Sequence, residues 1–164
     1  MIRARHVLVG ALLLSASAAP ARADLTAFIG ATTTPANRQT RGFAIGTGLV
    51  IVGFEFEYAS TTDDPTVSAP SLKTGSGNLL LQTPGAFFGF QPYWTTGGGV
   101  YQEELVTPIA HKDTGFSLNT GGGVKVNLVG PIRLRVDYRV FKQTGSGALY
   151  STAHRVYAGL NVKF

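Results

Sequence analysis

The last stretch of the chain reads HRVYAGLNVKF, from His154 to Phe164. Every second residue from Val156 to Phe164 is apolar, whereas the residues between them, from Arg155 to Lys163, are polar, aromatic or glycine. A period of two residues is that of a β-strand, whose successive side chains point to opposite faces. The stretch therefore predicts a strand with one apolar and one polar face that ends on an aromatic residue.

The chain opens with the pattern of a secretory signal peptide. A basic start at residues 1–6 precedes an apolar run at 7–19 and the cleavage pattern Ala21-Arg22-Ala23. The run is shorter than the roughly 20 apolar residues of a spanning helix, which disfavours the alternative of an N-terminal anchor helix. We expect cleavage after Ala23, which divides the chain into a signal peptide at residues 1–23 and one mature domain at 24–164.

The composition excludes several classes of function. The chain has no Cys, which excludes disulfides, thiol chemistry and a lipid-modified cysteine at the cleavage site. Loss of Arg3, Arg5 and Arg22 with the signal peptide lowers the formal net charge from +5 to +2. The high isoelectric point therefore gives no argument for a nucleic-acid partner, and residues 24–164 suit a single domain.

Alternating segments separated by turn-forming residues predict eight strands in the mature chain. Three connections are short, near Val50, Pro84 and Gly130, and they alternate with longer polar ones at 35–39, 60–77, 104–114 and 143–151. Short turns at one end and longer loops at the other are the asymmetry of an outer-membrane β-barrel. The expected strands are approximately residues 25–33, 41–49, 54–58, 78–83, 88–103, 115–128, 132–141 and 154–164.

The segment at residues 132–141 shows the sharpest alternation, with apolar side chains between Arg133, Arg135, Asp137 and Arg139. In a soluble sandwich or a periplasmic lipocalin-like barrel, the apolar face would be the core. In a membrane barrel, that face would meet lipid and the charges would line the lumen. Export, the terminal aromatic residue and aromatics at the predicted strand ends favour the membrane barrel. These aromatics are Phe54, Phe88, Phe90 and Phe164 at one end and Tyr58, Phe116 and Tyr150 at the other.

The terminal Phe164 and the alternating strands resemble the small eight-stranded OmpA/OmpX-type barrels of Gram-negative bacteria. The resemblance implies an all-β fold, an eight-stranded antiparallel up-and-down transmembrane β-barrel in the cell outer membrane, exported through the periplasm. It implies outer-membrane lipid and lipopolysaccharide, periplasmic chaperones and the barrel-assembly machinery as partners, and it implies no cofactor. The assembly signal that it implies consists of Tyr157, Leu160, Val162 and Phe164.

The clearest cluster of candidate functional residues is charged. An eight-stranded barrel has an interior that side chains just fill, and unpaired buried charges are costly. We therefore predict a network of ion pairs that plugs the lumen, with a narrow ion path as the alternative. Glycines on the same polar faces are expected to make room for long Arg and Tyr side chains. The predicted network consists of Glu55, Glu57, Arg133, Arg135 and Arg139, with Lys125 and Asp137 nearby.

Some small outer-membrane barrels modify lipid A with a His and a Ser near the outer rim. Ser117, Ser151, His111 and His154 raise this alternative, but the local patterns of those families are missing. The mature chain has no metal-ligand spacing and no phosphate-binding loop pattern. We therefore predict a non-enzymatic barrel that presents four loops at the cell surface, in envelope integrity or surface contact. A small-solute pore is the alternative.

Overall fold

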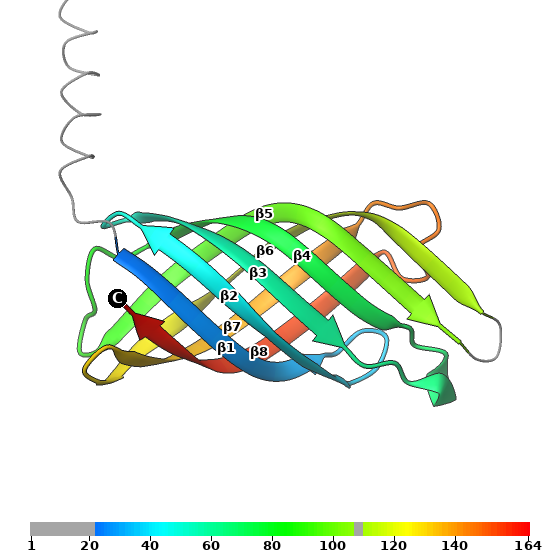
Figure 1. Ribbon diagram of the computed structural model, residues 1–164, viewed down its shortest axis with the longest axis horizontal. Helices are drawn as coiled ribbons and strands as arrows, with labels where there is room; N and C mark the ends of the chain where they lie inside the picture. The colour runs from blue at the N-terminus through cyan, green and yellow to red at the C-terminus, as the bar shows by residue number, and fades with distance from the viewer. Residues whose placement is uncertain (1–21, 107–109) are drawn as a thin grey trace, which may run out of the picture.

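The computed structural model describes residues 22–106 and 110–164, which form one closed antiparallel β-barrel (Figure 1). Each strand pairs with its neighbours in the sequence, and β8 closes the barrel by pairing with β1. The prediction of an eight-stranded up-and-down barrel is confirmed. The strands are β1 (Arg22–Thr32), β2 (Arg38–Gly48), β3 (Val52–Thr61), β4 (Ser71–Gln82), β5 (Phe90–Leu105), β6 (His111–Val129), β7 (Ile132–Gln143) and β8 (Thr152–Lys163).

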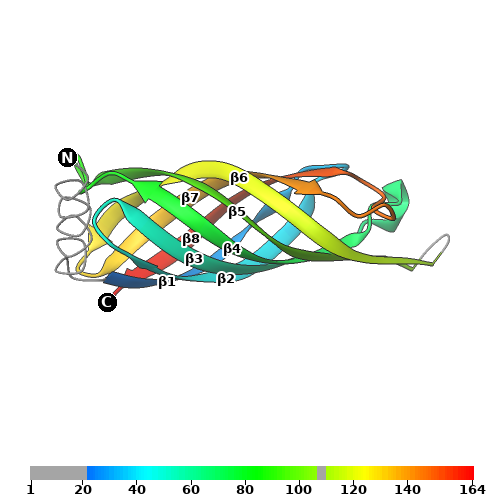
Figure 2. The ribbon, with the colours of Figure 1, turned by 90° about the horizontal axis from the view of Figure 1, so that it is seen from above.

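The barrel has two different ends, on the left and right of Figures 1 and 2. The turn end carries the connections at 49–51, 83–89 and 130–131. It also holds the seam where Ala23 and Phe164 exchange main-chain hydrogen bonds of 3.0 and 2.9 Å. The loop end carries the connections at 33–37, 62–70 and 144–151, with a short 3-10 helix at η1 (Pro65–Val67), and it also holds the end of β5 and the start of β6. Over the described ranges, no helix is long and apolar enough to cross a membrane.

Several strands differ in length from the prediction. β4 begins at Ser71 rather than near residue 78, because the stretch Gly75-Ser76-Gly77 pairs with both β3 and β5 instead of forming a loop. β5 and β6 stay paired as far as Leu105 and His111, so residues 104–105 and 111–114 of the expected loop belong to strands. The 83–89 connection is longer than predicted. Glycine and serine favour turns, but hydrogen-bonded neighbours on both sides hold these residues in a strand.

The barrel buries charged residues and exposes large apolar ones. Arg135 and Arg139 have no exposed surface, whereas Ile29 and Phe54 on the exterior are 67% and 64% exposed. The closed sheet leaves no strand edge unpaired, as a membrane-spanning sheet requires. A soluble lipocalin-like barrel would have the opposite arrangement, so that alternative is wrong. The apolar exterior is that of a barrel whose outer surface meets lipid.

Candidate functional site

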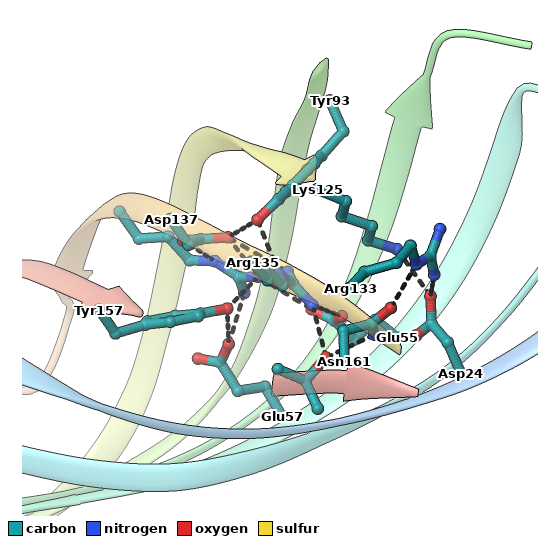
Figure 3. Close-up of polar contacts among 12 residues, drawn as sticks. Asp24, Glu55, Glu57, Tyr93, Lys125, Arg133, Arg135, Asp137, Tyr157 and Asn161 are labelled. Carbon is teal, nitrogen blue, oxygen red and sulfur yellow. Dashed lines mark hydrogen bonds and ion pairs between the residues drawn. The ribbon is translucent and has the colours of Figure 1, made fainter. Parts of the chain in front are cut away.

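A network of ion pairs fills the middle of the lumen (Figure 3). Its members come from the inward positions of β3, β7 and β8, and each is at most 3% exposed. Three carboxylates face three guanidinium groups, so the formal charges balance. The members are Glu55, Glu57, Arg135, Asp137, Arg139 and Arg155.

Glu55 binds both buried arginines of β7. Arg135 binds both oxygens of the Glu55 carboxylate, with Nη1 in short contact with Oε2 and Nη2 3.1 Å from Oε1. Arg139 Nη2 also donates to Oε1, at 2.8 Å. Asp137 lies between the same two arginines, 3.1 Å from Arg135 Nη2 and 3.0 Å from Arg139 Nε. Since β3 and β7 are not neighbours in the sheet, the bonds to Glu55 cross the lumen.

Glu57 joins the third arginine to the network. Its carboxylate accepts from Arg155 Nη1 at 3.1 Å and from the Tyr157 hydroxyl at 3.1 Å, and it lies 3.3 Å from Arg139 Nη1. Arg155 Nη2 also donates to Thr74 Oγ1 at 2.9 Å, which links the network to β4. The lumen is therefore cross-linked between four strands by charge-assisted hydrogen bonds.

A second charged group lies nearer the turn end. Asp24 Oδ2 accepts from Lys125 Nζ at 2.7 Å and from Arg133 Nη2 at 3.0 Å, and Arg133 Nε donates to Asn161 at 2.7 Å. A cavity of about 130 Å³ opens here and is lined in part by these charged side chains and by Glu55. The structure thus groups Arg133 with Asp24, whereas the sequence placed it with the two glutamates.

Tyr93 and two glycines shape the wall around the network. The Tyr93 hydroxyl accepts from Arg135 Nε at 2.7 Å and makes a short hydrogen bond to Asp137, while its ring centroid lies 4.8 Å from the Arg135 guanidinium carbon. A Cβ atom on Gly123 would come within 2.6 Å of that hydroxyl, and one on Gly121 within 3.0 Å of Arg139 Cγ. These glycines leave room for the neighbouring Arg and Tyr side chains, as expected from the sequence.

The loop end of the lumen is covered by the connection at 144–151. The carboxylate of Glu103, itself 1% exposed, accepts from the Leu149 main-chain nitrogen at 2.6 Å and lies 3.4 Å from His111 Nε2. A Cβ atom on Gly145 would clash with the Tyr101 hydroxyl, which shows how closely the loop packs. Below this cover, an apolar layer consists of Leu72, Tyr101, Phe141 and Ala153.

The serines and histidines considered for catalysis are not assembled. Ser117 is buried on the inward face, whereas His154 faces outward and its Nδ1 lies 2.7 Å from the Tyr138 hydroxyl, so the barrel wall separates them. His111, expected in a loop, belongs to β6, and Ser151 is exposed at the end of the last loop. Within residues 22–106 and 110–164, no group of three or more His, Asp or Glu is placed to hold a metal ion.

The residues of the implied assembly signal lie on both faces of β8 and just beyond it. Leu160, Val162 and Phe164 face outward, whereas Tyr157 is buried in the lumen and its ring stacks on Phe28 at 4.0 Å. Ala21 of the predicted cleavage pattern lies outside the described residues, and Ala23 is the second residue of β1. Cleavage after Ala23 and recognition of the last strand both stay predictions.

No protein-family model matches the sequence, and a comparison with curated proteins gives no match. Several solved structures are similar in fold, three of which follow. The N-terminal barrel of Pseudomonas aeruginosa OprF is 17% identical, with a TM-score of 0.67 over 87% of this chain and 97% of that chain. Neisserial surface protein A is 15% identical, with a TM-score of 0.67 over 88% and 96%. The outer-membrane enzyme PagL is 13% identical, with a TM-score of 0.54 over 85% and 98%. The chain therefore has the fold of the small eight-stranded outer-membrane β-barrels.

Proposed function

We propose that this chain is a non-enzymatic integral protein of the cell outer membrane that presents its four loops at the cell surface. The main support for this proposal is that side chains fill the lumen. Six buried charged residues balance one another across it, and the loop at 144–151 covers one end. An interior filled in this way supports a rigid scaffold better than a pore.

The charges on the outer surface of the barrel support an orientation in which the loop end faces the outside of the cell. There it would meet anionic headgroups such as those of lipopolysaccharide. On the outward faces, the charged residues that follow the apolar band toward the loop end are mostly basic. The turn end, with Ala23 and Phe164, would then face the periplasm, where chaperones and the assembly machinery meet the chain. These outward charged residues are Arg41, Lys73, Glu104, Lys112 and Lys142.

The proposed role is in envelope integrity or surface contact. PagL shows that an enzyme can have this fold, and a fold alone does not decide function. The separation of Ser117 from His154 by the barrel wall supports the non-enzymatic role. Lipid A from cells with and without the protein should give the same mass spectrum, and a new lipid A species that depends on the protein would contradict this role.

Recording from the purified protein in planar lipid bilayers tests the closed lumen. We expect no steady conductance from the wild-type barrel, because the charged network occupies the middle of the lumen and the connection at 144–151 packs over its loop end. A porin inserted under the same conditions serves as the positive control. Stable, unitary conductance steps from the unmodified protein would contradict a scaffold function and favour a function as a small-solute pore.

A further inference from the structure

The cavity of about 130 Å³ at the turn end, called the turn-end pocket below, lies in the lumen and reaches the first turn at Leu49 and Val50. Glycine occupies three inward positions in its lining, Gly46 and Gly48 on β2 and Gly53 on β3. Side chains just fill the interior of an eight-stranded barrel. Because glycine has no side chain, this wall leaves room for a small molecule opposite the charged residues of β6 and β7.

The positive charges in the lining of the pocket exceed its negative charges. Lys125 and Arg133, 3% and 7% exposed, share one oxygen of Asp24 at distances of 2.7 and 3.0 Å (Figure 3). Lys163, at the end of β8, adds a third cation. The other carboxylate in the lining, that of Glu55, is already bound by two arginines of the central network. Since buried charges are costly unless they are balanced, this excess of cations favours an anion as the occupant.

Hydrogen-bond donors of the pocket lie on different strands. The ammonium group of Lys125 has three N–H donors, and its hydrogen bond to Asp24 uses one of them. On the glycine wall, a Cβ atom on Gly48 would lie 3.8 Å from Gln82 Nε2, so this amide nitrogen borders the same space. The volume is several times the roughly 30 Å³ that one water molecule occupies in the liquid. An anion with several oxygens therefore suits the pocket better than a halide.

We propose that the turn-end pocket binds a small, soluble oxyanion of the phosphate class. An anion that can carry more than one negative charge offsets the cations that Asp24 alone does not balance. A lipid phosphate fits poorly, because the pocket lies inside the barrel and the attached acyl chains would have to enter the lumen. This site goes beyond the proposed scaffold function. With the turn end toward the periplasm, as proposed, the anion enters from the periplasm.

Equilibrium dialysis of radiolabelled inorganic phosphate against the full-length mature barrel, folded in octyl glucoside micelles, tests this site. Sodium chloride holds the ionic strength constant, and the gel mobility of unheated samples verifies folding. We expect the wild type to bind phosphate saturably, at a single site per barrel. Lys125→Met should weaken this binding about tenfold or more, the effect of losing one hydrogen bond to a charged group.

Two further variants separate the pocket from general electrostatic attraction. Gly53→Leu fills the pocket and leaves every charge in place, and a Cβ atom at this position would lie no closer than 3.4 Å to its neighbours. We expect it to weaken phosphate binding as Lys125→Met does, and it decides the question if Lys125→Met fails to fold. Lys73→Met removes an exposed outward cation at the loop end and should bind phosphate as tightly as the wild type.

The proposal is overturned if the wild type shows no saturable phosphate binding, or if Gly53→Leu binds phosphate as tightly as the wild type. An equal loss in Lys73→Met and Lys125→Met would also overturn it, because the attraction would then come from the overall charge. Binding of phosphatidic acid added to the micelles, without binding of inorganic phosphate, would assign the affinity to a lipid headgroup instead. These outcomes do not depend on the scaffold function, which the conductance and lipid A measurements test separately.

Discussion

Replacing Glu57 with Ala is expected to lower the free energy of unfolding by about 3–5 kcal/mol, the usual cost of removing one partner of a buried ion pair. The substitution removes the carboxylate that lies 3.1 Å from Arg155 Nη1 and 3.3 Å from Arg139 Nη1. Both guanidinium groups are buried, so water cannot replace the lost partner. The intact network is not itself evidence of high stability, because desolvation of its six charges opposes their attraction.

Denaturant unfolding of the barrel in lipid vesicles, followed by the gel mobility of unheated samples, measures this loss. The matched control is Glu104→Ala, which removes the same side chain from an exposed outward position. Substitutions at such positions usually change stability by no more than about 0.5 kcal/mol. Equal effects of the two substitutions would show that Glu57 is not held in a buried network.

Replacing Leu160 with Arg is the second change with a large expected effect. Leu160 lies on the outward face of β8, 56% exposed, and pairs with Ala27 and Leu134, which also face outward. A basic residue near the middle of the lipid face of a barrel costs about 2–4 kcal/mol. We expect a loss of that size in the free energy of unfolding in vesicles, together with less barrel in the outer-membrane fraction of cells.

Thr152→Arg is the matched control for this prediction. Thr152 lies on the same face of the same strand, at the loop end, and pairs with the exposed Lys142. Because this position belongs to the charged border of the apolar band, an arginine there should cost little. If both arginine variants lose the same amount of stability, the exterior of β8 has no apolar zone of the kind that a bilayer requires.

The alternation of side chains predicted the strands, their inward faces and most members of the charged network. Glu55, Glu57, Arg135 and Arg139 were placed inward by parity alone, since inward positions recur at every second residue of a strand. Parity does not show which strands face each other across the lumen, because that depends on the stagger of all eight strands. The sequence therefore grouped Arg133 with the glutamates, whereas its carboxylate partner in the structure is Asp24 on β1.

Arg155 and Asp24 were missed for a related reason. Asp24 is the only acidic residue of β1 and Arg155 is the only arginine of β8, so neither forms a pattern along the sequence. Arg155 lies opposite Arg139 in the β7–β8 register. Two buried arginines side by side require an acidic group nearby, and this requirement could have identified Arg155 as a member of the network. The turn at Phe88 and Gly89, closed by main-chain hydrogen bonds between Phe87 and Phe90, was missed because a turn with positive φ at Phe contradicts the usual residue preference.

A double-mutant cycle between Glu57 and Arg155 tests the cross-lumen network most directly. The free energy of unfolding in vesicles is measured for the wild type, Glu57→Ala, Arg155→Met and the double variant. Because the two side chains share a buried contact of 3.1 Å, we expect the double variant to lose less stability than the sum of the single losses. The expected interaction energy is about 0.5–3 kcal/mol. Losses that add to within about 0.5 kcal/mol, as for independent sites, would contradict a lumen closed by ion pairs.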